Sequence, residues 1–311
     1  MIEQSIHQST DKLIGHLPLV RGSYIEHADL SRYSRFRVGG PAEILFKPAD
    51  VDDLQLFMSS TSPAIPITVI GVGSNILIRN GGVNGVVVRL GRNFSDISVN
   101  DTKIRTGAGA LDLNVARFAQ RHTISGLEFL SGIPGSIGGT LKMNGGAYGK
   151  EIGDITVTAT VVDRYGNLSI LDHTNLDFSY RHCGVPVDCI FLAAELDGIQ
   201  GNREEISALM DTIAKTRIES QPTRGATGGS TFKNPRGLKA WEVIDEAGCR
   251  GLRLGGAIVS EKHCNFLINE GQATASELEA LAEEVRQRVF NKCGIMLEWE
   301  IQRIGNTEIH Q

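Results

Sequence analysis

Hydrophobic residues recur along the chain at two spacings, which predict a mixed α+β fold. Residues 274–290 place Leu278, Leu281, Val285 and Val289 on one face and charges on the other, as in an amphipathic helix. Short apolar runs bounded by glycine and polar turn residues predict strands. The further expected helices are 51–59 (after the N-cap Asp50), 111–120, 202–217 and 239–247, and the expected strands are 42–46, 67–70, 76–78, 155–163, 168–171, 189–196, 265–269 and 296–304.

The order of these elements divides the chain into three regions. Residues 1–30 are polar with one amphipathic segment and are expected to form an N-terminal extension. Residues 31–198 alternate strands with short helices, and we expect one domain of two subdomains, 31–92 and 93–198. Residues 199–311 are expected to form a third, separate α+β domain. A chain of 311 residues is long enough for this division.

Composition excludes several classes of partner. The net charge is -5 and the chain has no basic run, so we expect no nucleic-acid partner. The first 20 residues lack the apolar stretch of a signal peptide, and no run of about 18 apolar residues occurs, so we expect a cytoplasmic protein without a membrane partner. Five cysteines, odd in number and without C-x-x-C spacing, predict reduced thiols and no metal site.

A glycine-rich segment, residues 131–149, is the clearest candidate binding feature, and we refer to it as the glycine run. Clustered glycines allow successive backbone N–H groups to converge on an anion such as a diphosphate. No Lys-Ser or Lys-Thr pair closes the run, so it is not a P-loop, and Pro134 and the mid-chain position do not fit a dinucleotide fingerprint. The alternative is a series of tight turns without a ligand.

Seven short motifs, in this order between about residues 30 and 305, resemble the MurB family of UDP-N-acetylenolpyruvoylglucosamine reductases. They are SRFRVGGP (34–41), GVGSN (71–75), SGIPG (131–135), NGGAYG (144–149), YR (180–181), GSTFKNP (229–235) and LEWE (297–300).

The resemblance implies a PCMH-type, or vanillyl-alcohol-oxidase-like, FAD-binding fold of two small subdomains plus a substrate-binding domain. It implies non-covalent FAD, NADPH as hydride donor, and reduction of the enolpyruvyl group of a UDP-sugar to UDP-N-acetylmuramate in peptidoglycan synthesis. The FAD contacts that it implies are Gly71, Val72, Gly73, Ser74, Asn75, Ile133, Pro134, Gly135, Gly138, Gly139, Asn144, Gly146, Ala147 and Tyr148.

Three positions match the family's catalytic residues. Arg181 matches the arginine that meets the charge developing on the substrate carboxylate, a role suited to a permanently charged guanidinium. Ser230 matches the general acid, which needs a partner to resupply its proton. Glu300 matches the glutamate that stabilises the intermediate. On an alternating strand Glu298 would share its face, and we expect Glu298 to be structural.

Substrate contacts are expected from polar residues near the serine and further along the chain. The candidates are Arg224, Lys233, Asn234, Arg250 and His263.

Two departures from the family pattern bear on the site. Residues 192–231 contain no aromatic residue, so the chain resembles the shorter subclass that lacks a tyrosine-bearing loop over the substrate. Gln302 stands where some members carry an arginine near the flavin, and Arg303 is one residue away, on the other side of a strand.

Two other functions stay open at this stage: a flavin-dependent oxidase of small alcohols on the same fold, and a non-catalytic nucleotide-sugar binder. The oligomeric state is open too, with a monomer as one option.

Overall fold

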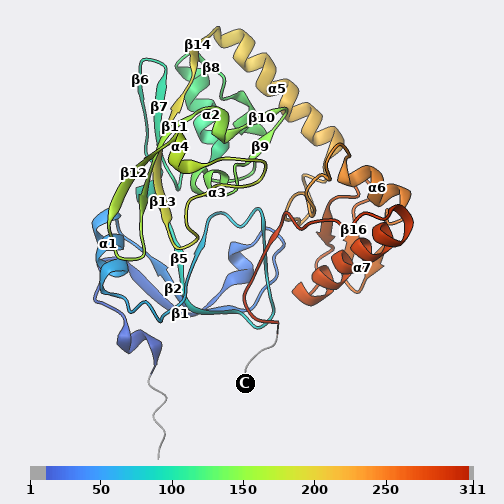
Figure 1. Cartoon of the computed structure of the whole chain (residues 1–311), viewed down its shortest axis with the longest axis horizontal. Coiled ribbons are helices and arrows are strands. Elements are labelled where there is room, and N and C mark those ends of the chain that lie inside the picture. The colour runs from blue at the N-terminus through green and yellow to red at the C-terminus, as the bar shows by residue number, and fades with distance from the viewer. Residues whose placement is uncertain (1–11, 308–311) are drawn as a thin grey trace, which may run out of the picture.

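The computed structural model describes residues 12–307, which form three packed bodies (Figure 1). The first is a four-stranded sheet in the order β1-β2-β5-β3, with β2, β5 and β3 parallel and β1 antiparallel to β2. Its strands are β1 (Ser23–Asp29), β2 (Pro41–Lys47), β3 (Ile67–Ile70) and β5 (Val83–Arg89), and its helix is α1 (Val51–Ser60). As predicted, Asp50 caps α1, its side chain accepting a bond from the N–H of Asp53.

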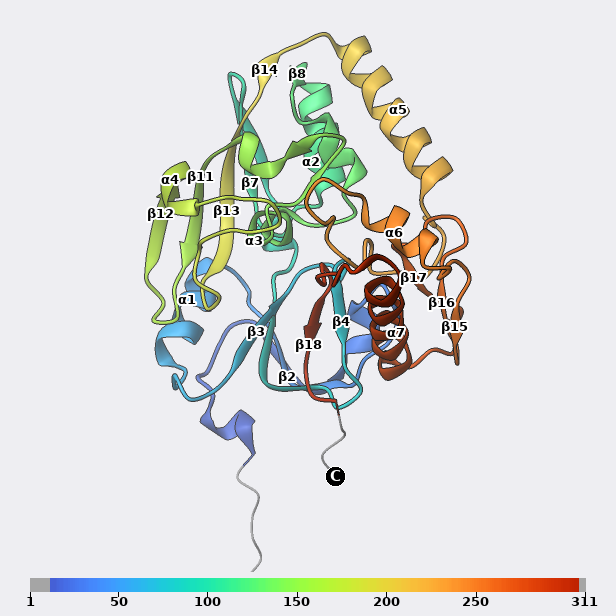
Figure 2. The same cartoon turned by 45° about the vertical axis from the view of Figure 1, so that its right-hand side comes forward.

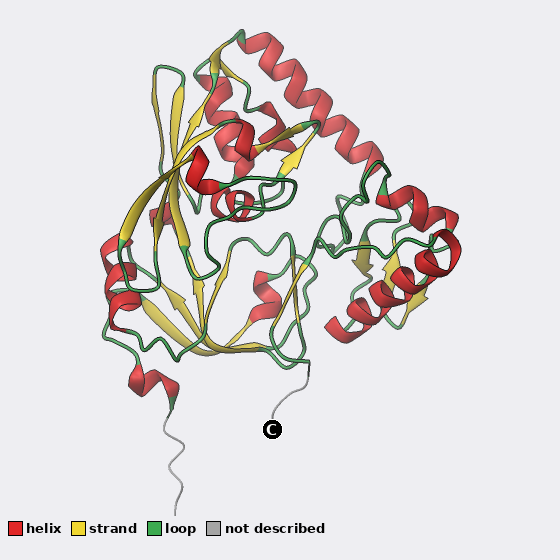
Figure 3. Cartoon of the chain, viewed as in Figure 1, coloured by secondary structure: helices red, strands yellow, loops and turns green. Residues whose placement is uncertain are grey.

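The second body is a five-stranded antiparallel sheet in the order β12-β11-β13-β7-β6. Helices lie on one face of this sheet, as Figure 3 shows. The strands are β6 (Ile97–Asn100), β7 (Lys103–Gly107), β11 (Thr156–Val162), β12 (Leu168–Asp172) and β13 (Ile190–Asp197), and the helices are α2 (Asp112–Arg121), α3 (Ile137–Lys142), α4 (His173–Leu176) and α5 (Arg203–Ser220). Most of the glycine run lies in α3 and the loops on either side of it.

The third body packs α7 on a three-stranded antiparallel sheet, with α6 against α7. It holds α6 (Ala240–Glu246), β15 (Arg253–Leu254), β16 (Ala257–Val259), β17 (Leu267–Asn269) and α7 (Ala275–Cys293). The face of α7 formed by Leu278, Leu281, Val285 and Val289 is fully buried, as its spacing predicts. Thr274 and Glu277 form a capping box at its start.

Short elements complete the chain. β4 (Ile76–Ile78) pairs in parallel with β18 (Gln302–Ile304), and Figure 2 shows these two strands side by side next to α7. The others are β8 (Ile124–Ser125), β9 (Gly146–Ala147), β10 (Lys150–Glu151), β14 (Ile199–Gln200) and the 3₁₀ turns η1 (Leu13–His16), η2 (Leu30–Tyr33), η3 (Arg92–Phe94), η4 (Glu128–Gly132) and η5 (Ile152–Asp154).

The structure contains elements that the sequence analysis did not list, among them α3, β5, β6, β7 and β16. It also differs from the expectations in three further ways. The expected extension 1–30 contains β1, which joins the first sheet, while residues 1–11 lie outside the described residues. Helix α5, expected in the third domain, buries Ile206 and Met210 in the core of the second body. The expected strand 296–304 is regular only at 302–304, because the preceding residues pair with a loop of the third body through Trp299 and Phe232.

Across residues 12–307, none of the helices is both long enough and apolar enough to cross a lipid bilayer.

Candidate active site

Arg181 and Glu300 form an ion pair, although 119 positions separate them in the sequence. The Arg181 Nε donates to Glu300 Oε1 at 3.0 Å, and only 16% and 11% of the two side chains are exposed. Burial raises the pKa of Glu300, while the neighbouring Arg181 acts in the opposite direction. Arg181 lies in the left-handed backbone region (φ 55°), a conformation that costs free energy and is frequent at functional sites.

A second carboxylate, that of Glu151, also holds Arg181, and the sequence analysis did not select it. Its Oε1 accepts from Arg181 Nη1 at 3.3 Å, and its Oε2 accepts from Asn144 Nδ2 at 2.7 Å. The carbonyl of Gly146 accepts from Arg181 Nη2 at 3.4 Å. The only sequence signal for Glu151 was its position two residues after the glycine run. The run therefore contacts the predicted catalytic arginine directly.

Ser230 lies next to the backbone pairing that positions Glu300. The N–H of Glu300 donates to the carbonyl of Thr231 at 2.9 Å, and the N–H of Thr231 donates to the carbonyl of Asn265 at 2.7 Å. Ser230 itself bridges to Phe266. The segment carrying the serine thus runs between residues 265–266 and 299–300, which brings Ser230 and Glu300 to the same edge of the third body.

The loop 71–75 connects this edge to the glycine run. Asn75 Nδ2 donates to the carbonyl of Glu300 at 3.0 Å, and the N–H of Gln302 donates to the carbonyl of Asn75 at 3.0 Å. A Cβ at Gly71 would lie 2.8 Å from Ser136 Oγ, and one at Gly229 would lie 3.7 Å from the carbonyl oxygen of Ser74. Three predicted motifs therefore meet around one loop.

Glycines of the run serve two different purposes. The N–H of Gly138 already donates to the carbonyl of Ala108, and a Cβ there would lie 3.0 Å from the Ala108 Cβ, so close packing favours glycine at this position. Gly139 is exposed, and a Cβ there would meet no atom closer than 3.8 Å. Gly139 thus leaves the backbone open to a ligand, which fits the close approach of a diphosphate, whereas Ser136 Oγ fills the space beside Gly71.

Two arginines near Tyr148 form a basic site that the sequence analysis also missed. Burial, then the nearby Arg35, lower the pKa of the half-buried Arg217 on α5. Among residues 12–307, no carboxylate forms an ion pair with Arg217, and its side chain donates only to Gln221 at 3.4 Å. Tyr148 donates its hydroxyl to the carbonyl of Ile213 on the same helix. In the same described range Arg35 forms no ion pair with a carboxylate either, and two such cations at one place favour an anionic ligand.

Lys233 and Asn234, two predicted substrate contacts, lie close to the Arg181 loop. The N–H of Asn234 donates to the Tyr180 hydroxyl at 3.3 Å, and Lys233 Nζ lies 3.5 Å from Glu298 Oε2. Glu298 is largely exposed at 78% of its side chain, consistent with a structural ion pair. A pocket of about 540 Å³ opens here, lined by Tyr180, Asn234, Pro235, Gly237, Leu238, Lys239 and Glu242.

The structure gives other interactions to the remaining residues that the sequence analysis considered. Arg250 forms a bidentate ion pair with Asp245, both N···O distances being 2.8 Å. His263 packs edge-on against Phe266, and burial lowers its pKa. Arg224 is exposed. Arg303 pairs with Glu279 on α7 at 3.1 Å and lies over the Trp299 ring, so its guanidinium belongs to the third body.

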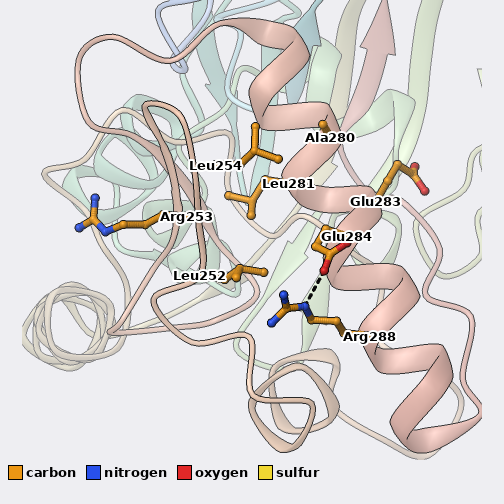
Figure 4. Close-up of a pocket in the computed structure, with 8 residues that line it drawn as sticks. All are labelled: Leu252, Arg253, Leu254, Ala280, Leu281, Glu283, Glu284 and Arg288. Carbon is orange, nitrogen blue, oxygen red and sulfur yellow. Dashed lines mark hydrogen bonds and ion pairs between the residues drawn. The ribbon is translucent and has the colours of Figure 1, made fainter.

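A second pocket, of about 550 Å³, lies between residues 252–254 and α7 (Figure 4). Its lining contains none of the predicted site residues. Among residues 12–307, no three His, Cys, Asp or Glu side chains come together as metal ligands, and all five cysteines are free thiols.

Comparisons with known proteins identify the family of each part of the chain. Residues 42–172 match the FAD binding domain family, and residues 221–304 match the family described as UDP-N-acetylenolpyruvoylglucosamine reductase, C-terminal domain. A protein of that name from Parvibaculum lavamentivorans is 55% identical over 298 residues, covering 96% of each chain, and one from Paramagnetospirillum magneticum is 55% identical over 93% of this chain and 94% of its own.

A solved structure gives the same answer for the fold. The MurB crystal structure from Thermus caldophilus covers 92% of this chain and 100% of its own, with a TM-score of 0.80 and 33% identity. The predicted PCMH-type fold and the predicted family are thereby confirmed. The chain belongs to the family of UDP-N-acetylenolpyruvoylglucosamine reductases.

Proposed function

We propose that Arg181, Ser230 and Glu300 carry the chemistry of this family's reaction, at the edge where the second and third bodies meet. As a family member, the chain is an FAD-dependent oxidoreductase that uses NADPH to reduce the enolpyruvyl group of UDP-N-acetylenolpyruvoylglucosamine in peptidoglycan synthesis. The single observation that carries the residue assignment is the Arg181–Glu300 ion pair, which joins two of the three proposed residues at 3.0 Å.

Arg181 is proposed to bind the substrate carboxylate. Hydride addition to the terminal carbon of the enol ether moves negative charge onto the neighbouring carbon and the carboxylate. Two of the five N–H donors of the guanidinium already bind Glu300 and Glu151, and these bonds orient it. The guanidinium can therefore meet the developing charge without reorganising.

Ser230 is proposed to donate the proton that completes the reduction. Its hydroxyl needs a nearby group that lowers the cost of losing the proton, and the serine segment pairs with the residues that carry Glu300. Since burial raises the pKa of Glu300, this carboxyl is suited to exchanging protons nearer to neutral pH than an exposed glutamate.

The FAD would be held by the loop 71–75 and the glycine run, as the sequence predicted. When bound, the flavin accepts hydride from NADPH and delivers it to the substrate. The open backbone at Gly139 and the positive charges of Arg35 and Arg217 support an anionic ligand between these segments.

The nucleotide-sugar is proposed to occupy the pocket beside Tyr180, with Lys233 and Asn234 as its contacts. We keep Arg224, Arg250 and His263 as candidate substrate contacts outside the lining of this pocket. We further propose an FAD-binding part and a substrate-binding part as in the sequence analysis, except that β1 and α5 belong to the FAD-binding part. We also propose a cytoplasmic location, where UDP-sugars and NADPH are available, and a monomer, because one chain carries Arg181, Ser230 and Glu300.

Ser230→Ala tests the assignment. Flavin absorbance follows two half-reactions separately: anaerobic bleaching by NADPH, and recovery of absorbance on adding the enolpyruvyl substrate. We expect the first rate to stay within about twofold and the second to fall by about 10²-fold or more, the contribution of a positioned general acid. Ser59→Ala, on the exposed end of α1, is the matched control. Equal slowing of both steps would remove Ser230 from the role of proton donor.

A further inference from the structure

A buried carboxyl, that of Asp112, lies against the glycine run and takes no part in the chemistry above. Asp112 is the first residue of α2 and is fully buried. Its Oδ2 accepts from the Thr140 hydroxyl at 2.7 Å, and its N–H donates to the carbonyl of Gly135 at 3.2 Å. A Cβ added at Gly135 would lie 2.6 Å from the same Oδ2, so glycine is required there.

The other oxygen, Asp112 Oδ1, is buried and has no hydrogen-bond partner within the part of the chain that the structure describes. A buried carboxylate with one oxygen unpaired is costly, whereas the neutral acid avoids burying a charge. The start of a helix favours the ionised form. Burial nevertheless outweighs this effect and raises the pKa of Asp112 to about 7, although hydrogen bonding of the carboxyl group to the Thr140 hydroxyl and to the Gly135 backbone acts in the opposite direction.

We infer that Asp112 is a positioning residue for the FAD diphosphate: the neutral carboxyl holds Thr140 and Gly135 in their binding arrangement, and its ionisation weakens FAD binding. This inference rests on the proposed function, which places the diphosphate on the glycine run. An ionised Asp112 would add a negative charge against the loop that meets two phosphates, and the low dielectric around it would screen that charge poorly.

The charged groups on the elements packed against Asp112 are engaged elsewhere. On α3, Lys142 Nζ donates to the carbonyls of Val185 and Pro186 at 3.1 and 2.8 Å. On η4, Glu128 accepts from the Ser125 hydroxyl and the N–H of Gly126. The causes of the raised pKa of Asp112 include no charged side chain. On α2 itself, Arg117 and Arg121 lie beyond its first turn, and Gln120 makes the contact of α2 with α5 through Ser207.

The test is the FAD dissociation constant of the full-length protein between pH 6 and 8.5, measured by equilibrium dialysis of the holoenzyme with FAD absorbance as readout. If FAD binds the form with neutral Asp112, the constant rises by about tenfold from pH 6 to pH 8 for a group that titrates near 7. Asp112→Asn keeps the shape and removes the charge, so its constant should vary by less than about twofold over this range. Thr140→Val removes the bond that stabilises the ionised form, so the rise should move to higher pH.

Each outcome decides one point. A tenfold rise that persists in Asp112→Asn, or a flat profile in the natural protein, overturns the inference. If Asp112→Asn does not fold, Thr140→Val with an unmoved profile overturns it independently. Gly139→Ala tests separately whether the glycine run binds FAD at all. The added methyl meets no protein atom closer than 3.8 Å but would stand where the diphosphate approaches. Unchanged FAD affinity in Gly139→Ala means that the run does not bind FAD, and the proposed function then fails at that point.

Discussion

Replacing Glu151 by glutamine tests whether this carboxylate, two residues after the glycine run, positions Arg181. The two oxygens of Glu151 accept from two donors, Arg181 Nη1 at 3.3 Å and Asn144 Nδ2 at 2.7 Å. Glutamine has one oxygen and one amide nitrogen, so it can accept from only one of these donors and faces the other with a donor of its own. The shorter contact favours Asn144, which leaves Arg181 with Glu300 as its only carboxylate partner.

The size of the effect follows from the bond that is lost. A hydrogen bond to a charged group contributes about 1.5–3 kcal/mol. If this energy holds the guanidinium in its productive position, its loss slows substrate reduction by about 10- to 150-fold, because each 1.36 kcal/mol corresponds to about tenfold in rate. Reduction of the flavin by NADPH does not involve the substrate carboxylate, so that rate should stay within about twofold.

Stopped-flow absorbance of the flavin measures both half-reactions on one preparation. Glu195→Gln is the matched control, because Glu195 forms an exposed ion pair with Lys103 at 3.1 Å on the sheet and such pairs contribute little. A Glu151→Gln enzyme that reduces the substrate at the natural rate would refute the reasoning. So would one in which both half-reactions slow equally, because that result indicates general damage to the flavin site.

Three further predictions concern stability and the loop at the centre of the site. Asp53 is buried and accepts from the N–H groups of residues 21, 22 and 49, so Asp53→Asn should lower the free energy of unfolding by about 2–4 kcal/mol in urea titrations, and a loss below 1 kcal/mol would contradict the role. Arg79, through a bidentate bond, and Arg303 lower the pKa of Glu279. Glu279→Gln should therefore lower the free energy of unfolding by about 1–3 kcal/mol at pH 7. The matched control Glu284→Gln removes an exposed carboxylate and should lower it by less than about 0.5 kcal/mol. Because folding lowers the pKa of Glu279, its ionised side chain stabilises the protein above the pKa of the unfolded state, and this stabilisation disappears as the pH falls through the pKa of the folded state. The melting temperatures of Glu279→Gln and the natural protein should therefore converge in acid. A difference that stays constant with pH would be the contrary result. Gly73→Ala should abolish soluble holoenzyme, because Gly73 has φ 68° and an added Cβ would collide with the carbonyl of Tyr33; normal yield with bound flavin would be the contrary result.

Local patterns predicted the helices and strands of this protein well where a single face is buried. The 274–290 periodicity matches α7, and the expected strands 155–163 and 168–171 match the paired strands β11 and β12. The final strand was too long because its apolar alternation arises from two successive partners, a loop of the third body and then β4. Alternation reports burial on one side and does not identify the partner.

The sequence motifs proposed which residues form the site, but they did not predict which of these side chains touch one another. Motif positions identified Arg181 and Glu300, but nothing in either motif indicates that the two side chains touch. Glu151 and Arg217 were missed for the same reason, since each becomes significant only through a neighbour distant in sequence. Helix α5 was predicted as a helix, yet its periodicity could not tell which of two cores receives Ile206 and Met210.

The parallel pairing of β18 with β4 means that the chain leaves the FAD-binding bodies after α5 and returns to them at residue 302. The intervening unit is therefore tethered at both ends. It also shares its core with the N-terminal part of the chain, because Phe36, Val38 and Leu77 pack in one cluster with residues of α6 and α7. Glu300 lies two residues before the second tether, so the strand pairing that closes the fold also holds Glu300 beside Arg181.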